Sequence, residues 1–349
     1  MKILHILNTG KLSGAENVAA DICMMFKNDY QMAYCSPDGL IRQALEDRDI
    51  TYLPIDSLTI KALNRVISEY QPDLIDAHDV RATVLAATIA DKGIPFISHL
   101  HVNNDDMKKL TIKSFLYMIA ARKAKKIIAV SESCINDYFF KPVIKNKTIV
   151  LKNIIYSQRL NALIDKDSQE YCFDFIFLGR LTDQKNPQRI AAVASSVLKQ
   201  LPYARFGVIG EGELKEEMLE IFEKEGVTKQ VFFTGNLSYP YKAIKQANCM
   251  LFCSRFEGTP ISALEAMYFG VPIVSTPTDG LIELIDNNIT GYLSDDDDCL
   301  VSAIIKLIEN KEIRKEMSEK QIEKFNRINN EDHYKIILSG VYANAIKAE

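Results

Sequence analysis

The sequence predicts an α/β protein with two domains, each built on a parallel β-sheet covered by helices. Short apolar runs, typical of buried strands, alternate with amphipathic helical stretches along almost the whole chain. The alternation is interrupted once by a polar, charged stretch and then restarts. With 349 residues, the chain is long enough for two domains that each have a core.

The interruption sets the predicted domain boundaries. We expect a first domain over residues 1–155, a linker over 156–170 and a second domain over 171–328. The last segment, 329–349, has a helical pattern and is expected to pack back on the first domain. Predicted strands of the first domain lie at 3–7, 31–36, 51–55, 74–77, 96–99, 126–130 and 148–151, and those of the second at 173–178, 205–209, 231–234, 249–253 and 271–275.

Composition excludes several classes of protein. The chain is 47% hydrophobic and 25% charged with a net charge of −4, which is ordinary for a globular protein and argues against a nucleic-acid partner. Its seven cysteines include no Cys-x-x-Cys pair, which indicates reduced thiols in a cytoplasmic protein. The apolar N-terminus is too short for a signal peptide, and no segment approaches the roughly 20 apolar residues of a membrane span.

A strand–loop–helix–strand unit over residues 248–276 offers a site for an anion. We expect Thr259 to be the N-cap of a helix with Pro260 in its first position and Gly270 at its end. The unpaired N–H groups of such a helix start attract phosphate. Glu257 precedes this start and Glu265 lies inside the helix, so two carboxylates are placed to bind an uncharged, hydroxylated group.

Two cations follow the first strand of the second domain. Arg180 and Lys185 lie in the loop that begins at Gly179, before a helix over 187–200 that Asn186 is expected to cap. Ligands of open α/β sheets bind at the carboxyl ends of strands, so both cations are placed to meet a diphosphate there. For this motif alone, two solvated surface charges remain the alternative.

Together these motifs resemble the donor domain of the retaining glycosyltransferases of family four, which have the GT-B fold. The resemblance rests on Gly-Arg-Leu at 179–181 with Lys185, on Gly210-Glu-Gly, on Gly235-Asn236, and on Glu257-x₇-Glu265 before Gly270-Val-Pro. Ser13-Gly14-Ala15-Glu16 is similar to the family's N-terminal Gly-Gly-Ala-Glu loop. The resemblance implies two Rossmann-like domains whose sheets face a central cleft.

The resemblance also implies roles for individual residues. Glu265 would hold the ribose hydroxyls of a nucleotide, Glu257 the transferred sugar, and Arg180 and Lys185 the diphosphate. Gly14 would let the first loop approach that diphosphate. The rest of the expected donor site consists of Gly179, Gly210, Asn236, Leu237, Gly258, Thr259, Ile261 and Ser262, with Asn236 and Leu237 near the base.

One position departs from the family pattern. Thr259-Pro260-Ile261 stands where many members have Phe-Gly-Leu. Because Pro260 has no N–H, phosphate contacts must come from Ile261 or Ser262.

Four histidines follow or lie within predicted strands. His101, just past a strand end, matches the family histidine that contacts the donor sugar, and we expect it to face the cleft. His99 is assigned to the alternate face and expected to pack inside, His5 is expected in the core, and His78 is open between a cleft role and a structural one. A His-x-His pair can bind zinc, but no nearby cysteine or acidic residue completes a tetrahedral set, so no metal site is predicted.

A basic stretch surrounds an apolar segment in the first domain. Seven Lys or Arg residues lie within 108–126 without an acidic residue, around the apolar run 115–119. Such a stretch suits an anionic membrane surface, where a lipid-linked acceptor would be found. A helix with an apolar core face and solvated charges is the equally weighted alternative.

The predicted activity is therefore retaining transfer of a hexose or N-acetylhexosamine from a nucleotide-diphospho-sugar, with a UDP-sugar favoured, to a glycan or lipid-linked hydroxyl. We expect no cofactor and no metal, with His101, Glu257, Arg180 and Lys185 acting on the donor. The alternatives are a sugar-nucleotide epimerase, which would convert the donor without an acceptor, and a non-catalytic partner subunit of a transferase, which would lose the site residues. The expected location is the cytoplasm, at the inner face of the membrane if the basic stretch binds lipid.

Overall fold

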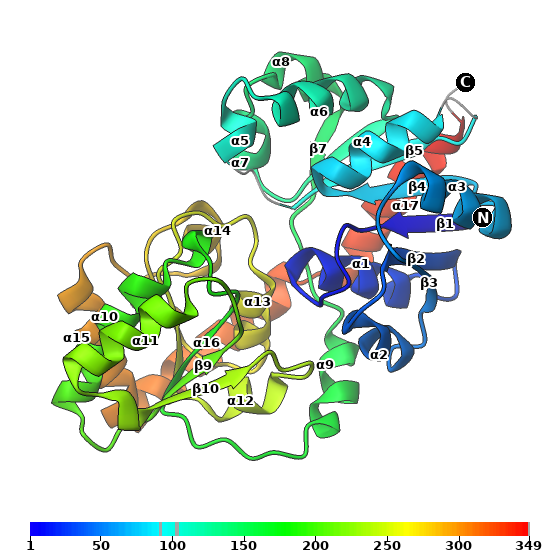
Figure 1. The fold of residues 1–349 in the computed structure, drawn as a ribbon. Coiled ribbons are helices and arrows are strands. Elements are labelled where there is room, and N and C mark those ends of the chain that lie inside the picture. Colours follow the sequence, from blue (N-terminus) through cyan, green and yellow to red (C-terminus); the bar gives the residue numbers. More distant parts are fainter. Residues whose placement is uncertain (91–92, 102–104, 348–349) are drawn as a thin grey trace. The chain divides into compact units, whose positions relative to one another are not determined.

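The computed structural model describes residues 1–90, 93–101 and 105–347, which fold into two compact units. The first unit consists of residues 1–156 together with 330–349, and the second of residues 157–329 (Figure 1). The segment 156–170, predicted as a linker, instead contains helix α9 (Ser157–Leu163) and the 3₁₀ helix η3 (Ile164–Lys166), and α9 buries Arg159, Leu160 and Leu163.

The described residues of the first unit form a seven-stranded parallel sheet in the order β3-β2-β1-β4-β5-β6-β7. Its strands are β1 (Lys2–Ile6), β2 (Gln31–Pro37), β3 (Thr51–Ile55), β4 (Leu74–His78), β5 (Phe96–Leu100), β6 (Lys126–Ala129) and β7 (Thr148–Val150). The helices are α1 (Gly14–Met25), α2 (Ile41–Glu46), α3 (Ile60–Tyr70), α4 (Asp79–Ile89), α5 (Asp105–Lys108), α6 (Ile112–Lys123), α7 (Ser133–Asn136), α8 (Lys141–Ile144), η2 (Lys145–Lys147) and α17 (Glu331–Lys347).

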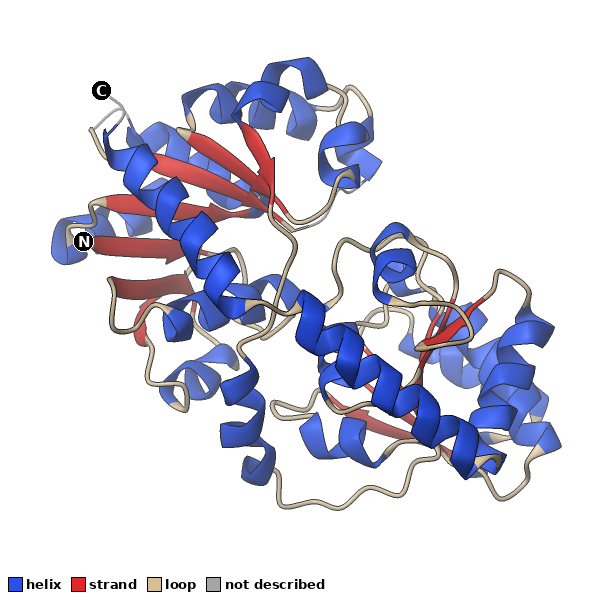
Figure 2. Ribbon diagram, turned by 180° about the vertical axis from the view of Figure 1, so that it is seen from behind, coloured by secondary structure: helices blue, strands red, loops and turns tan. Residues whose placement is uncertain are grey.

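The last helix of the chain, α17, lies across one face of this first sheet (Figure 2). Its Tyr342 is fully buried and donates a hydrogen bond of 3.0 Å from its hydroxyl to Asp76 Oδ2 on β4. The C-terminal segment therefore covers polar side chains in the middle of the sheet.

The described residues of the second unit form a six-stranded parallel sheet in the order β10-β9-β8-β11-β12-β13. Its strands are β8 (Phe175–Leu178), β9 (Phe206–Ile209), β10 (Val231–Gly235), β11 (Cys249–Phe252), β12 (Ile273–Ser275) and β13 (Gly291–Leu293). The remaining helices are η4 (Asp183–Lys185), α10 (Pro187–Gln200), α11 (Lys215–Glu225), η5 (Thr228–Gln230), α12 (Tyr241–Gln246), α13 (Ile261–Tyr268), α14 (Asp279–Leu284), α15 (Asp297–Glu309) and α16 (Lys311–Ile328).

Both sheets reverse their strand order in the same way. The reversal lies between β1 and β4 in the first sheet and between β8 and β11 in the second. At such a point the loops that follow the two strands run in opposite directions and leave room for a ligand at the carboxyl edge. The loop with Arg180 and Lys185 follows β8, and the loop with Glu257 follows β11.

Two predicted helix starts differ in detail. Helix α13 begins at Ile261, and Pro260 rather than Thr259 is its N-cap, because Pro260 has an extended backbone with φ −69° and ψ 123°. Asn186 precedes α10 as expected but has φ +55°, and its side chain makes no capping bond. Within the described part of the chain, no helix is both long and apolar enough to pass through a bilayer.

Candidate functional site

The switch point of the second sheet brings Lys185 and Glu257 together. Lys185 Nζ lies 2.5 Å from Glu257 Oε1, and the Ser254 hydroxyl donates to the same oxygen at 2.6 Å. Both charged side chains are largely withdrawn from solvent, with 13% of Lys185 and 5% of Glu257 exposed. The pair is thus an ion pair at the edge of the protein interior, where each charge fixes the position of the other.

Gln184, which the sequence did not single out, connects the two loops at this point. The Gln184 side-chain amide donates to the Phe256 main-chain carbonyl at 3.2 Å. The Gln184 main-chain carbonyl accepts from the Arg255 main-chain N–H at 2.9 Å. Its Oε1 also accepts from Arg180 Nη2 at 3.3 Å, while Arg180 itself is exposed. Arg180 is therefore a solvated cation in the same loop as Lys185, and the Gln184 side chain accepts a hydrogen bond from its guanidinium.

Glu265 belongs to a buried ion pair of its own. Arg159 Nη2 donates to Glu265 Oε1 at 3.1 Å, and Arg159 Nη1 donates to the Tyr241 hydroxyl. The guanidinium also lies 5.5 Å from the centre of the Tyr241 ring. Arg159 is fully buried and Glu265 is 4% exposed. No local pattern predicts this partner, because Arg159 lies in a polar stretch 106 residues earlier.

The N-terminus of α13 offers the backbone donors that the sequence predicted. The amides of Ala263 and Leu264 bond to the Pro260 carbonyl, whereas those of Ile261 and Ser262 have no backbone acceptor among the described residues. No side chain caps this helix start. Thr259 and Ile261 are buried, and Ser262 is half-buried. Two N–H groups of a helix start thus remain for an anion.

Glycines allow the strand-end loops to approach each other. A Cβ at Gly210, which has φ +140°, would lie 1.9 Å from the Gly179 carbonyl oxygen. A Cβ at Gly280, in α14, would lie 1.6 Å from the Gly258 carbonyl oxygen. Gly210 and Gly280 therefore let backbone pack against the loops that contain the predicted donor-binding residues.

The other predicted donor residues lie on loops around these groups. Asn236 is exposed and Leu237 half-buried, directly after β10. Gly14 is the first residue of α1 in the first unit and is exposed. A Cβ there would meet no described atom within 4 Å, so packing inside the first unit does not require glycine at this position.

His5 and His99 are fully buried, as predicted. His101 is only 6% exposed, and its Nε2 lies 2.8 Å from Nδ1 of the buried His78. The assignment of His99 to the alternate face is wrong, since residues two apart in a strand share a face and the His99 and His101 rings are 4.5 Å apart. The following residues 102–104 lie outside the described part of the chain.

An acidic neighbour of the His-x-His pair, absent from the local sequence, comes from β4, so the expectation that no acidic residue lies near is wrong. Asp76 Oδ1 lies 3.8 Å from His99 Nδ1. Potential ligand atoms lie within 4.8 Å of one another in His78, His99 and His101, and likewise in His5, Asp76 and His78. Among the described residues of the first unit, these could hold a cation, although two pairs of their nitrogens already face each other.

Two family models together match most of the chain. Residues 13–159 match the model described as Glycosyltransferase Family 4, and residues 165–324 match that described as Glycosyl transferases group 1. The chain belongs to the GT-B glycosyltransferases.

The names of two curated relatives describe galactosyltransferases that act on a lipid-linked sugar and on lipopolysaccharide. A UDP-Gal:α-D-GlcNAc-diphosphoundecaprenol α-1,3-galactosyltransferase of Escherichia coli is 23% identical, and the match covers 89% of each chain. A lipopolysaccharide 1,6-galactosyltransferase of E. coli K12 is 24% identical over 67% of this chain and 64% of its own. An uncharacterized glycosyltransferase of Methanocaldococcus jannaschii is 26% identical, and the match spans 57% of its length.

The fold of the glycosyltransferase is also found in solved structures. HepE of Anabaena, crystallised with UDP and glucose, matches with a TM-score of 0.84 at 18% identity, over 98% of this chain and 99% of that one. The sucrose-phosphate synthase of Thermosynechococcus elongatus matches with a TM-score of 0.75 at 14% identity, over the full length of both chains. At this level of identity the likeness establishes the fold, and the predicted GT-B architecture is confirmed.

Proposed function

We propose that this glycosyltransferase transfers a hexose or N-acetylhexosamine from a UDP-sugar to a hydroxyl of a glycan or lipid-linked acceptor, with retention of the anomeric configuration. The observation that supports it most is the grouping at one switch point of the Lys185–Glu257 pair and the uncapped start of α13. A second carboxylate, Glu265, lies inside the same helix. A diphosphate, a sugar and a ribose each find a chemically suited partner there.

In this proposal the cations and the helix start bind the diphosphate. Lys185 and Arg180 neutralise its charge, and the Ile261 and Ser262 amides donate to its oxygens. These interactions strengthen as the sugar departs, because the leaving diphosphate gains negative charge in the transition state. Glu257 keeps the Lys185 ammonium in place and accepts hydrogen bonds from the sugar.

The two carboxylates have separate tasks. A carboxylate can accept two hydrogen bonds from a cis-diol, which suits Glu265 for the ribose hydroxyls. Arg159 fixes the orientation of that carboxylate. The resemblance adds His101 as a contact of the transferred sugar. In the front-face reaction of the family, the acceptor oxygen attacks the anomeric carbon from the side of the departing diphosphate, and a diphosphate oxygen takes the acceptor proton.

The names of the relatives support the choice of substrates. The E. coli relative that matches 89% of this chain uses a UDP-sugar and a diphosphoundecaprenol-linked acceptor according to its name. HepE of Anabaena was crystallised with UDP-glucose as well as with UDP and glucose. We therefore propose a UDP-sugar as donor and a role in surface polysaccharide assembly.

Apolar side chains on the first unit favour the membrane interpretation of the basic stretch. Tyr117, Ala120 and Ala121 of α6 face the core, yet seven other apolar side chains of this region are exposed. We call these the α6–α8 surface; they are Leu110 (67% exposed), Ile112 (82%), Phe115 (47%), Leu116 (45%), Ile119 (45%), Phe139 (50%) and Val143 (38%).

The α6–α8 surface lies among the cations of residues 108–126, and Lys109, Arg122 and Lys123 are exposed. A helix that is apolar on its outer face and is flanked by cations suits an anionic lipid surface. We propose that this surface holds the enzyme at the inner face of the membrane, beside a lipid-linked acceptor.

A donor-consumption assay tests the proposed transfer. The wild type is incubated with a panel of nucleotide-sugars, with and without membrane lipid extract as the source of acceptor, and release of the nucleoside diphosphate is followed. We expect acceptor-dependent release with a UDP-sugar, lost in Glu257→Ala and in Lys185→Ala. Lys199→Ala, which removes an exposed ion pair with Glu225 in the same unit, is the matched control and should remain active.

The same assay separates the alternatives. A sugar-nucleotide epimerase would convert the donor when no acceptor is present. A non-catalytic partner subunit would release nothing alone. Full activity of both Glu257→Ala and Lys185→Ala would overturn the proposed site.

A further inference from the structure

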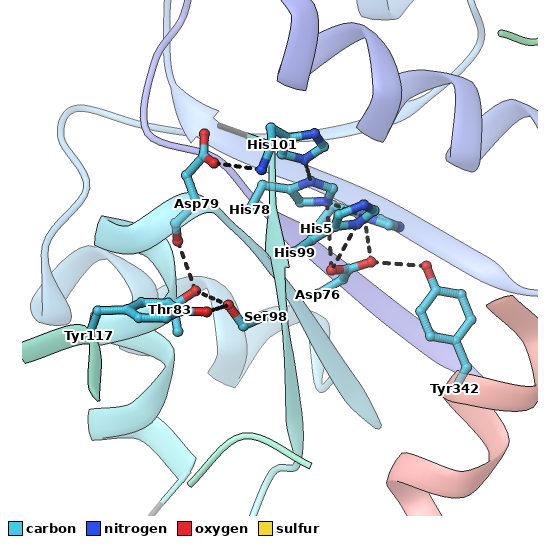
Figure 3. Close-up of polar contacts among 10 residues, drawn as sticks. All are labelled: His5, Asp76, His78, Asp79, Thr83, Ser98, His99, His101, Tyr117 and Tyr342. Carbon is cyan, nitrogen blue, oxygen red and sulfur yellow. Dashed lines mark hydrogen bonds and ion pairs between the residues drawn. The ribbon is translucent and has the colours of Figure 1, made fainter. Parts of the chain in front are cut away.

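Four of the five histidines of the chain gather around one carboxylate on a single face of the first sheet (Figure 3). The strand register explains the gathering: His5 on β1 lies opposite Asp76 on β4, and His78 on β4 lies opposite His99 on β5. Alternate residues of a strand share a face, so His101 joins the same group. The four histidine side chains and the Asp76 side chain are all buried.

Three of these rings form a chain of hydrogen bonds. His5 Nδ1 lies 3.0 Å from His78 Nε2, and His78 Nδ1 lies 2.8 Å from His101 Nε2. Burial lowers the pKa of His78 and of His101 well below the ordinary value, so both rings are neutral at neutral pH. A neutral imidazole has one N–H and one bare nitrogen, so His78 must donate through one nitrogen and accept at the other.

The tautomers of the three rings are consequently coupled. If His78 donates to His101, then His101 has its proton on Nδ1 and His5 donates to His78. In the reverse setting the proton lies on Nε2 of His5, and Nδ1 of His101 is bare. The two terminal nitrogens, His5 Nε2 and His101 Nδ1, have no partner among the described residues.

Burial of the two ends selects the first setting. An orphaned buried N–H is rarer than an orphaned buried acceptor. His5 is fully buried, whereas His101 at the other end is 6% exposed. Both terminal nitrogens are buried, so we assign the N–H to the end whose residue is partly exposed, His101, and the bare nitrogen to His5. Asp76 lies beside the bond between His5 and His78 in both settings, 3.7 Å from His5 Nδ1 and 3.8 Å from His78 Nε2.

The residue after His78 holds the backbone of His101. Asp79 has φ +66°, a left-handed conformation that costs a non-glycine residue energy and is found most often at functional sites. Its Oδ1 accepts a hydrogen bond of 3.1 Å from the His101 N–H. Two consecutive residues therefore hold the His101 ring and the His101 main chain.

We propose that His78 and Asp79 are positioning residues for His101, and that the chain from His5 presents the Nδ1–H of His101 as a fixed hydrogen-bond donor toward the transferred sugar. The acceptor of that donor rests on the proposed function. The arrangement of the three rings does not, since it follows from the first unit alone.

A metal site is the competing interpretation of the same residues. A metal ion needs a free lone pair from each ligand, whereas the nitrogens of His78 and His101 point at each other across 2.8 Å. Titration with Co²⁺ distinguishes the two. Stoichiometric binding with a visible ligand-field spectrum that His78→Asn abolishes would overturn the hydrogen-bonded chain.

Nitrogen NMR of the histidine-labelled full chain tests the tautomers without any substrate. The groups that face His101 are His78, Asp76, His99 and Asp79, and the exposed His333 on α17 provides a resonance outside the cluster. We expect a protonated Nδ1 and a bare Nε2 for His101 at neutral pH, and a mixture of tautomers in His78→Asn. A wild-type His101 protonated on Nε2, or present as a mixture, would overturn the proposal.

Kinetics test the positioning roles. Asp79→Gly removes the carboxylate while glycine accepts the left-handed backbone, so folding is preserved and kcat should fall by about 10²-fold with donor KM within about threefold. Gln71→Gly, at another residue with positive φ, is the matched control and should leave kcat unchanged.

A lower kcat with nearly unchanged donor KM is also expected for His78→Ala. Part of the rate should be recovered in His78→Asn, whose amide can still bond to His101. Unchanged kcat in Asp79→Gly would refute the positioning role. If the wild type consumes no donor while the NMR result is as expected, the proposed function fails and the hydrogen-bonded chain stands.

Discussion

Replacement of Arg159 by methionine tests how the second unit holds Glu265. The methionine side chain fills a similar volume but leaves the Glu265 carboxylate, 4% exposed, without its cation and the Tyr241 hydroxyl without its donor. Removing one partner of a buried ion pair costs about 3–5 kcal/mol, because the remaining charge loses this counter-ion. At roughly 2–4 °C per kcal/mol for a domain of this size, the melting temperature should fall by roughly 6–20 °C.

A double-mutant cycle makes this prediction specific. Arg159→Met/Glu265→Gln removes both charges. Its loss of unfolding free energy should therefore be smaller than the summed losses of Arg159→Met and Glu265→Gln, by about 2 kcal/mol or more. Arg189→Met, which breaks contacts with the exposed Asp295 and Asp297, is the matched control and should cost about 1 kcal/mol or less. Calorimetric unfolding of the wild type, Arg159→Met, Glu265→Gln, the double variant and Arg189→Met measures all terms. An Arg159→Met loss no larger than that of Arg189→Met would refute the reasoning.

Three further predictions concern other parts of the molecule. Glu257→Gln and Glu257→Ala should both lose transfer activity, but Glu257→Gln should retain more thermal stability, because its amide oxygen can still accept from Lys185 and Ser254; equal stability of the two variants in a thermal scan would contradict this. Ile112→Ser/Phe115→Ser should weaken sedimentation with anionic vesicles by about tenfold or more without change in melting temperature, and unchanged sedimentation would exclude the α6–α8 surface. Burial lowers the pKa of His5 to about 4, so as pH falls from 6.5 toward 4 the unfolded chain binds a proton that the folded chain does not, and denaturant titrations should show a loss of roughly 3 kcal/mol from this residue; a flat profile over that window would contradict the buried neutral ring.

Local patterns were sufficient for the elements around the donor site. The apolar run at 249–253 and Gly270 correctly placed β11 and the end of α13, because burial of a central strand and a left-handed helix stop are both local signals. The start of α13 was misplaced by one residue, since Pro260 is compatible with the N-cap position as well as with the first helical position. β13 was missed because it is short, begins with glycine and lies between polar residues, so no apolar run marks it.

Contacts across the sequence were not predictable in the same way. Arg159 lies in a polar stretch, and only the fold shows that it is buried between Tyr241 and Glu265. The histidine cluster depends on the strand register, which places Asp76 of β4 beside histidines of β1, β4 and β5. No pattern within one strand contains that information. The Lys185–Glu257 contact could have been predicted from the sequence, because both residues follow strands that flank a switch point.

The central claim is that the switch point of the second sheet binds the diphosphate of a sugar nucleotide. Isothermal titration of the wild type and of Lys185→Met with UDP and with UMP tests it most directly. We predict that the wild type binds UDP at least about tenfold more tightly than UMP, and that this preference is clearly smaller in Lys185→Met, because the diphosphate has lost one of its two cations and retains only Arg180. Equal affinities in the wild type, or an undiminished preference in Lys185→Met, would contradict the account.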